Sequence, residues 1–351
     1  MADRCLTILV IGTLPPPIGG AAVSLQHLVE AIARRPEAHL IVVNTGGVRG
    51  SHLIGPFRFL RVLWNIFVGA ARADVVSLQP APSGVPYVGP FVWWSARLWR
   101  RPFLIRMFGG QDYRKLTGFR GAIVRWVVRR CDLYLAQTRE LVASAKSDGL
   151  ARVEWYPTSR PMEDSRLRSM DAETRCRRFV FLSHVKPAKG IGELVEAAER
   201  FDGEVSVDVY GPLLDGLTAS SFEGLRRVRY RGVVPAGTAV SVLADYHALL
   251  LPTYWVGEGY PGTVLEAYAA GLPVIATRWK AIPEVVDDTS GILVEPRDAD
   301  ALFEAMQKLV KDDELYRRLC DGVRAKRQFF NSARWVDEFV KLCGELSSGR
   351  R

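Results

Sequence analysis

Two glutamates, Glu258 and Glu266, lie eight positions apart across a segment that the sequence predicts to be a loop followed by a helix. Pro261, between them, has no backbone N–H to donate and is well suited to the first position of a helix. Apolar residues then recur at helical spacing as far as Gly271, where a glycine and a proline end the pattern. We therefore expect Glu258 on a loop and Glu266 in the first turns of a short helix.

The stretch between the two acids could bind a ligand. It contains Tyr260, Pro261, Gly262 and Thr263. Backbone N–H groups of a first helical turn have no helical acceptor, and together with the helix dipole they favour phosphate. Carboxylates accept hydrogen bonds from sugar or ribose hydroxyls. The same residues also fit a simpler arrangement, in which Glu266 offsets the helix dipole and Glu258 is a solvated loop residue.

The longer run from Gly257 to Met306 distinguishes between these alternatives. After the helix, segments 273–277 and 292–294 are expected to form short buried strands. This ordered run resembles the signature of the retaining glycosyltransferases of family 4, whose E-x7-E element is matched by Glu258 and Glu266. The resemblance implies an α/β protein with the GT-B fold, in which two Rossmann-like parallel-sheet domains face a central cleft.

The length and the order of elements agree with this architecture. A chain of 351 residues with 48% hydrophobic content indicates a folded protein of two domains. Strand and helix patterns alternate, which is typical of parallel sheets with crossover helices. The expected strands are 6–12, 39–44, 74–79, 103–107, 132–137, 179–182, 205–210, 228–230, 248–251, 273–277 and 292–294. We expect an acceptor-side domain over 1–160 and a nucleotide-sugar-binding domain over 161–332. By the resemblance, a C-terminal helix within 333–351 is expected to cross back to the first domain.

The composition limits the partners and the setting. The net charge of +9 points to an anionic partner, which could be a nucleotide, a phospholipid surface or nucleic acid. Five widely spaced cysteines without a C-x-x-C pair favour a reduced, cytosolic setting. The five histidines show no ligand spacing, so we expect no metal site and no cofactor besides the donor substrate. The N-terminus lacks the apolar core of a secretory signal, and no apolar run of about 18 residues predicts a membrane-spanning helix.

A second candidate site follows the first strand, where Gly19 and Gly20 precede a helix. Paired glycines at a helix start let the backbone approach an anion closely, although a tight strand-to-helix turn uses the same residues. The G-x-G-x-x-G pattern and the Gly-Lys-Ser/Thr of a P-loop are both absent. A similar glycine loop faces the donor diphosphate in the family, so the resemblance assigns Gly19 and Gly20 to donor binding.

The second half of the chain opens with a basic segment that includes His184, Lys189 and Gly190. A lysine at a helix entry can meet a phosphate held there, although surface lysines are common in this position. The family carries an arginine followed five positions later by Lys-Gly. Lys189 and Gly190 match this pattern, whereas His184 replaces the arginine. Because a histidine is charged only part of the time near pH 7, His184 could be a diphosphate ligand or a purely structural residue.

Four further positions are of interest mainly because of where they lie in the sequence. Gly211 and Val234 lie in turns after strands, where the family builds its base and ribose pocket, although turn chemistry alone also explains them. Phe108 stands where many members have a histidine close to the donor sugar, so that role is absent or moved here. Asp112 is assigned to catalysis as a polar residue of the cleft, with loop capping as an equal alternative.

Three segments, 57–67, 93–101 and 114–130, combine aromatic, aliphatic and basic residues. Basic amphipathic helices with tryptophan lie in membrane interfaces, but core-packed helices with a solvated basic face have the same composition. A nucleic-acid partner is not expected, because the cations sit beside large aliphatic side chains and no binding module is recognised. We expect a cytoplasmic location, with peripheral attachment to an anionic membrane surface as an open alternative.

The resemblance implies metal-independent, retaining transfer of a sugar from a nucleotide-diphosphate sugar to a glycan or a polyprenyl-diphosphate-linked acceptor. Glu266 would hold the ribose, Glu258 would orient the sugar, and Lys189 would stabilise the diphosphate as negative charge develops on it. The expected setting is bacterial polysaccharide biosynthesis, such as lipopolysaccharide or capsule. A nucleotide-sugar epimerase of the same fold and a non-catalytic sugar-nucleotide-binding subunit are the alternatives. We predict that Glu258→Ala and Lys189→Ala each abolish transfer and leave the fold intact.

Overall fold

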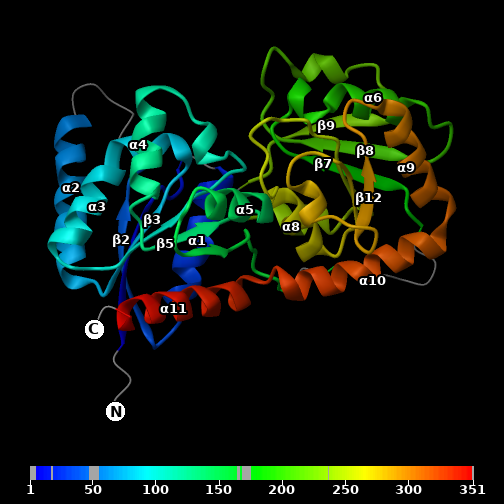
Figure 1. Ribbon diagram of the computed structural model, residues 1–351. Coiled ribbons are helices and arrows are strands. Elements are labelled where there is room, and N and C mark those ends of the chain that lie inside the picture. Colours follow the sequence, from blue (N-terminus) through cyan, green and yellow to red (C-terminus); the bar gives the residue numbers. More distant parts are fainter. Residues whose placement is uncertain are drawn as a thin grey trace. The chain divides into compact units, whose positions relative to one another are not determined.

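The computed structural model describes residues 5–16, 19–46, 55–163, 167, 175–235 and 237–349. The chain divides into two compact units (Figure 1): one comprises Met1–Ser159 and Ser332–Arg351, and the other Arg160–Asn331. These boundaries lie one residue from those expected at 160 and 332. The last helix, α11 (Ser332–Ser348), belongs to the first unit. The assignment of donor and acceptor binding to the two units stays a prediction.

The first unit is built on a parallel sheet with the strand order β2-β1-β3-β4-β5-β6. Its strands are β1 (Leu6–Gly12), β2 (Ala38–Asn44), β3 (Val75–Gln79), β4 (Phe103–Arg106), β5 (Leu133–Ala136) and β6 (Val153–Trp155). Its other helices are α1 (Gly20–Ile32), α2 (Gly55–Arg72), α3 (Val85–Leu98), α4 (Gly118–Val128) and α5 (Arg139–Ser147), with short 3-10 turns η1 (Pro82–Gly84) and η2 (Tyr113–Lys115). Leu9 and Ile11 share a core with the inner sides of α2, α3 and α4. Their neighbours Ile8 and Val10 are also fully buried, because successive strand residues point to opposite faces of a sheet that is covered on both sides.

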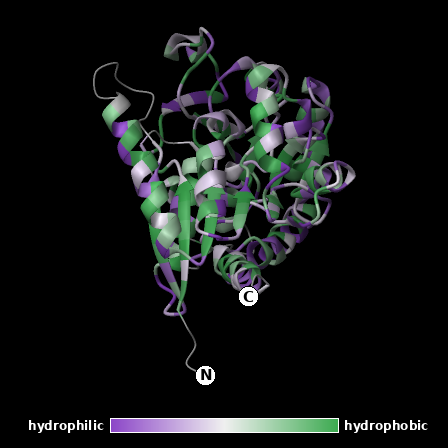
Figure 2. Ribbon diagram, turned by 60° about the vertical axis from the view of Figure 1, so that its left-hand side comes forward, coloured by the Kyte–Doolittle hydropathy of each residue, from purple (hydrophilic) through white to green (hydrophobic). Residues whose placement is uncertain are grey.

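The second unit repeats this architecture, with the strand order β12-β11-β10-β7-β8-β9. Its strands are β7 (Arg178–Leu182), β8 (Ser206–Tyr210), β9 (Val228–Gly232), β10 (Ala248–Leu251), β11 (Val274–Thr277) and β12 (Gly291–Val294). Its helices are α6 (Ile191–Glu199), α7 (Ala239–Leu243), α8 (Gly262–Ala270), α9 (Ala299–Lys311) and α10 (Asp313–Phe329), with 3-10 turns η4 (Pro187–Lys189), η5 (Ala219–Phe222) and η6 (Ile282–Glu284). Helix α6 packs beside α9, while α8 packs beside α7 and α10. Figure 2 shows strands coloured as hydrophobic along most of their length, which is typical of parallel strands covered by helices.

Every expected strand is present, and its ends differ from the expected ones by at most two residues. The structure adds β6, which has only three residues and lies at the edge of its sheet beside β5. Such a short edge strand leaves too weak a pattern to predict. Pro261 is the N-cap residue of α8, with extended backbone, rather than the first helical residue. In the part of the chain that is described, none of the helices has both the length and the apolar character needed to cross a bilayer.

Candidate functional site

The strand order of the second sheet defines where a ligand is expected. The chain runs from β7 to β8 and β9 on one side and then returns to place β10 on the other side of β7. The loops that follow β7 and β10 therefore leave the same edge of the sheet in opposite directions. In open parallel sheets, ligands bind outside the carboxyl ends of the strands at such a switch point. Lys189 lies in the loop after β7, and Glu258 lies in the loop after β10.

Lys189 and Glu258 form a buried ion pair at this switch point. The Lys189 Nζ donates to Glu258 Oε2 over 2.5 Å, and each residue is only 7% exposed. Thr253 Oγ1 donates to the same carboxylate oxygen at 2.8 Å. A buried charge is tolerated only when it is paired and hydrogen-bonded. Lys189 and Glu258 are therefore paired in the structure, whereas the sequence analysis expected Lys189 to stabilise the diphosphate and Glu258 to orient the sugar.

Helix α8 carries the second acid of the pair. Its amino end begins at Pro261 and its carboxyl end is closed by Gly271, which has φ 84°. Glu266 is partly exposed, and Oε1 accepts a hydrogen bond from Arg160 Nε at 3.1 Å. Arg160 is itself buried, so it fixes the orientation of the carboxylate.

The residues before Glu266 differ in what their side chains do. The hydroxyl of Tyr260 donates to Glu284 at 2.6 Å, and the ring is buried, so its side chain has a packing role. Pro261 is also buried, while Gly262 and Thr263 form the first turn of α8. The backbone amides of that turn have no helical acceptor and point along the positive end of the helix dipole. This end of α8 can therefore accept an anion.

His184 and Lys186 lie in the same loop as Lys189. Partial desolvation of the imidazole, and then the charges of Lys189 and Lys186, hold the pKa of His184 below its usual 6.5, while Glu258 opposes them. His184 is therefore mostly uncharged at neutral pH, although its side chain is exposed. Lys186 is buried, and its Nζ lies 3.2 Å from the centre of the Trp255 ring, a cation–π contact. A second ammonium thus belongs to the same loop as the Lys189 ammonium.

Two glycines in this region are required by the backbone itself. Gly190 has φ 76°, and a Cβ added there would lie 2.1 Å from the carbonyl oxygen of Pro252. Gly211 has φ 136°, and its Cβ would lie 1.7 Å from the carbonyl oxygen of Ser183. These residues let the loops after β7, β8 and β10 approach one another closely. Val234 is half-buried in the loop after β9, at the same edge of the sheet.

The remaining predicted site residues belong to the first unit. Gly19 is the N-cap residue of α1, and a Cβ added at Gly19 or Gly20 would meet no atom within 4 Å. The backbone there has space for a ligand. Phe108 is buried and lies over the Arg106 guanidinium at 4.7 Å. Arg106 in turn donates to Gln79 at 3.3 Å.

Asp112 has the contacts of a loop cap. Its carboxylate accepts hydrogen bonds from the backbone N–H and guanidinium of Arg114 and from Ser144 Oγ. Burial would raise the pKa of Asp112, but the hydrogen bonds from Arg114 and Ser144 outweigh burial and hold this pKa below its usual value. These contacts support the capping alternative.

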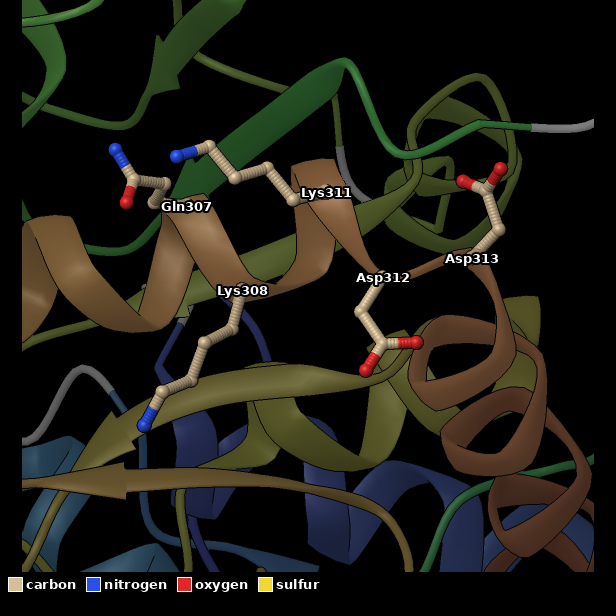
Figure 3. A pocket seen from close by; sticks show the side chains of 5 residues that line it. All are labelled: Gln307, Lys308, Lys311, Asp312 and Asp313. Carbon is tan, nitrogen blue, oxygen red and sulfur yellow. The ribbon is translucent and has the colours of Figure 1, made fainter.

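Two pockets of the second unit do not have the position or the lining expected of a diphosphate site. The pocket in Figure 3, about 620 Å³, lies where α9 meets α10, and its side chains diverge: Lys308 and Asp312 point one way, Lys311 and Asp313 another. Because α9 runs back along the sheet, this junction lies at the amino edge, away from Lys189. Another pocket, about 860 Å³, lies at the carboxyl edge, and its lining includes Glu193, Glu196, Glu295, Asp298 and Asp300. So acidic a lining does not suit a diphosphate. Among the described residues, no cluster of three His, Cys, Asp or Glu side chains could hold a metal ion.

Three residues of the site were not predicted: Thr253, Lys186 and Arg160. Thr253 directly follows the Leu249–Pro252 stretch, and a hydroxyl residue after a buried strand is the signal that could have found it. Lys186 could have been found by counting cations around His184. Arg160 contacts Glu266 across 106 positions of sequence, so no local pattern identifies it.

Residues 176–312 match the family model described as Glycosyl transferases group 1. The chain is 31% identical over 185 residues to the GDP-mannose-dependent alpha-(1-6)-phosphatidylinositol monomannoside mannosyltransferase of Mycolicibacterium smegmatis, which covers 49% of this chain and 48% of that protein. It is 24% identical over 241 residues to the MMP alpha-(1->4)-mannosyltransferase of Mycolicibacterium hassiacum, covering 66% of this chain and 56% of that protein. The chain thus spans about half the length of these relatives.

Among solved structures, Anabaena HepE in complex with UDP has a TM-score of 0.76 at 14% identity, and the alignment covers 97% of this chain and 100% of that protein. This likeness and the two six-stranded parallel sheets confirm the two-domain GT-B fold.

Proposed function

We propose that the chain is a retaining, metal-independent glycosyltransferase that moves a hexose from a nucleotide-diphosphate sugar to a glycan or lipid-linked acceptor. The observation that carries the proposal is the Lys189–Glu258 pair, which puts one ammonium and one carboxylate together at the switch point of the second sheet. Both residues lie within the segment that matches the group 1 family model, which supports the proposal.

The donor diphosphate binds between the two lysines and the amino end of α8. Lys189 exchanges Glu258 for a phosphate oxygen, so the buried ammonium keeps a negative partner throughout. Lys186 adds a second positive charge, and the first-turn amides of α8 add hydrogen bonds. As the bond between sugar and phosphate breaks, negative charge grows on the diphosphate, and these fixed groups stabilise it without a divalent cation.

The two acids hold the hydroxylated parts of the donor. Glu258, still held by Thr253, accepts hydrogen bonds from the sugar once Lys189 has turned to the phosphate. Glu266 keeps one oxygen on Arg160 and accepts from the ribose hydroxyls. Gly19 and Gly20 of the first unit keep the role in donor binding that the resemblance assigned to them.

The acceptor is proposed to be lipid-linked, in bacterial surface-glycan synthesis at the cytoplasmic face of the membrane. The M. smegmatis relative is named for a phosphatidylinositol monomannoside acceptor, which supports this choice. A polyprenyl-diphosphate-linked oligosaccharide is the acceptor to test first.

A thermal-shift screen with UDP, GDP, ADP and their sugars tests donor binding, because a ligand that binds the folded protein raises its melting temperature. The stabilising nucleotide sugar is then incubated with acceptor, with and without EDTA. NMR of the product reports the anomeric configuration, for which we expect retention. Conversion of the sugar without acceptor would indicate an epimerase, and donor binding without any product would indicate a binding subunit. The absence of stabilisation by every nucleotide would contradict the proposal.

A further inference from the structure

Helices α2, α3 and α4 are neighbours in the first unit (Figure 1). Each of them carries large apolar side chains that are exposed. On α2, Phe57, Leu60 and Trp64 are 78%, 61% and 65% exposed. On α4, Phe119 is 82% exposed. Single exposed apolar residues are normal on protein surfaces, whereas a contiguous group of large ones marks an interaction site.

The exposed residues follow the helical repeat. On α3, one side of the helix is buried in the core and consists of Val85, Val88, Val92 and Ala96. The other side consists of Tyr87, Phe91, Trp94 and Leu98, of which Tyr87, Trp94 and Leu98 are exposed. A spacing of three or four residues places each group on one face. The helix is therefore apolar toward the core and apolar toward solvent.

Aromatic contacts join the helices into one surface. The Phe67 ring of α2 lies 6.2 Å from Trp64 and 5.9 Å from Trp94 of α3. Trp93 of α3 lies 4.9 Å from Trp126 of α4. We call this surface the α2–α4 face. It is defined by Phe57, Leu60, Trp64, Tyr87, Trp94, Leu98, Trp99, Phe119 and Trp126, all of which are exposed.

The charges on these helices have one sign. The sequences of α2, α3 and α4 contain no aspartate or glutamate. They contain six arginines: Arg58, Arg61, Arg72, Arg97, Arg120 and Arg125. Arg58, Arg61 and Arg120 are exposed beside the aromatic residues. The complementary partner is anionic and apolar at the same time.

We propose that the α2–α4 face binds the surface of an anionic lipid bilayer. Tryptophan and phenylalanine enter the boundary between head groups and acyl chains, while arginine side chains extend to the anionic head groups. A second copy of this chain fits poorly, because symmetric contact would bring arginines against arginines. A nucleic acid fits poorly because the arginines are separated by large apolar side chains rather than gathered on a polar face. Since no described helix is apolar and long enough to span a bilayer, the face lies on the membrane.

Flotation with vesicles tests this proposal without any sugar donor or acceptor, so its result is independent of the proposed transferase activity. The intact chain is mixed with vesicles of phosphatidylcholine alone or with phosphatidylglycerol added. We expect it to float with the anionic vesicles at low salt and less at high salt, with a blue shift of tryptophan fluorescence. Trp64→Ser/Trp94→Ser should reduce partitioning by about tenfold or more.

Matched control variants distinguish binding through the α2–α4 face from non-specific binding to vesicles. Leu214→Ser removes an exposed apolar residue of the second unit, which is 39% exposed, and should have no effect. Arg61→Glu should reduce binding by about tenfold, since both the lost and the added charge act near the membrane. Arg34→Glu, exposed in the same unit but outside these helices, should not. The proposal is overturned if anionic vesicles do not retain the protein, if the Trp64/Trp94 variant binds normally, or if these variants instead abolish a dimer.

Discussion

Removing either partner of the Lys189–Glu258 pair should destabilise the second unit. The two side chains are 9% and 8% exposed, and the joined atoms are 2.5 Å apart. Substitution of one residue leaves the other charge buried without a partner, which costs about 3–5 kcal/mol. For a unit of this size, such a loss lowers the melting temperature by about 6–20 °C. The structure therefore revises the expectation that Glu258→Ala and Lys189→Ala leave the fold intact, because the sequence does not reveal that the two charges are partners.

The variants Glu258→Ala and Lys189→Met should respond differently to inorganic pyrophosphate. Glu258→Ala leaves the ammonium of Lys189 uncompensated, so pyrophosphate can take the place of the carboxylate and restore stability. Lys189→Met removes the cation and leaves a buried carboxylate, which repels the anion. Ligand binding stabilises the folded state in proportion to the logarithm of affinity, at about 1.4 kcal/mol for each factor of ten. The shift in melting temperature should therefore be larger than wild type for Glu258→Ala and near zero for Lys189→Met.

Calorimetry of both variants, with and without pyrophosphate, measures both effects. Asp321→Ala is the control, because it breaks a pair with Arg324 whose side chains are 66% and 67% exposed. That variant should lose no more than about 1 kcal/mol and keep the wild-type response. The reasoning fails if the single variants melt like wild type, or if Glu258→Ala loses the response to pyrophosphate as Lys189→Met does.

The site makes three further predictions. The pKa of His184 is depressed in the folded protein, so the unfolded state takes up the proton first, and the free energy of unfolding should decline as the pH falls below about 6.5. Denaturant titrations should show that His184→Gln reduces this decline. An unchanged decline would contradict the assignment. Lys186→Met should weaken pyrophosphate binding by about tenfold in calorimetric titration, and adding His184→Arg to this variant should recover most of the lost affinity. The affinity would not recover if Lys186 served only to pack on Trp255. Gly190→Ala should lower the free energy of unfolding of the second unit by more than about 1 kcal/mol. Gly192→Ala in α6 should be neutral or stabilising, because its added Cβ would meet nothing within 4 Å. Equal melting temperatures of the two variants would refute the strain argument.

The fold could be predicted because its signals are local. Buried parallel strands are short continuous apolar runs, such as Leu249–Leu251, and each is followed by a glycine, a proline or a helical repeat. The boundary between the units was predicted from proline and charge near Arg160. The α2–α4 face was only half predicted: its composition was visible, but exposure had to come from the structure. Phe91 and Val92 are equally apolar in sequence, and only the position of the core decides that Val92 is buried.

The partners within the site could not be predicted, because they come from distant parts of the chain. Lys189 and Glu258 are 69 positions apart, and the return of the chain to β10 brings their loops together. Their pairing also constrains which ligand can bind. A ligand that takes Lys189 away from Glu258 leaves a buried carboxylate that needs a new hydrogen-bond donor. A nucleoside diphosphate supplies the anion but no hydroxyls at Glu258, whereas the intact nucleotide sugar supplies both. The pair should therefore favour the intact donor over the diphosphate product, and Glu258→Ala should reverse that preference.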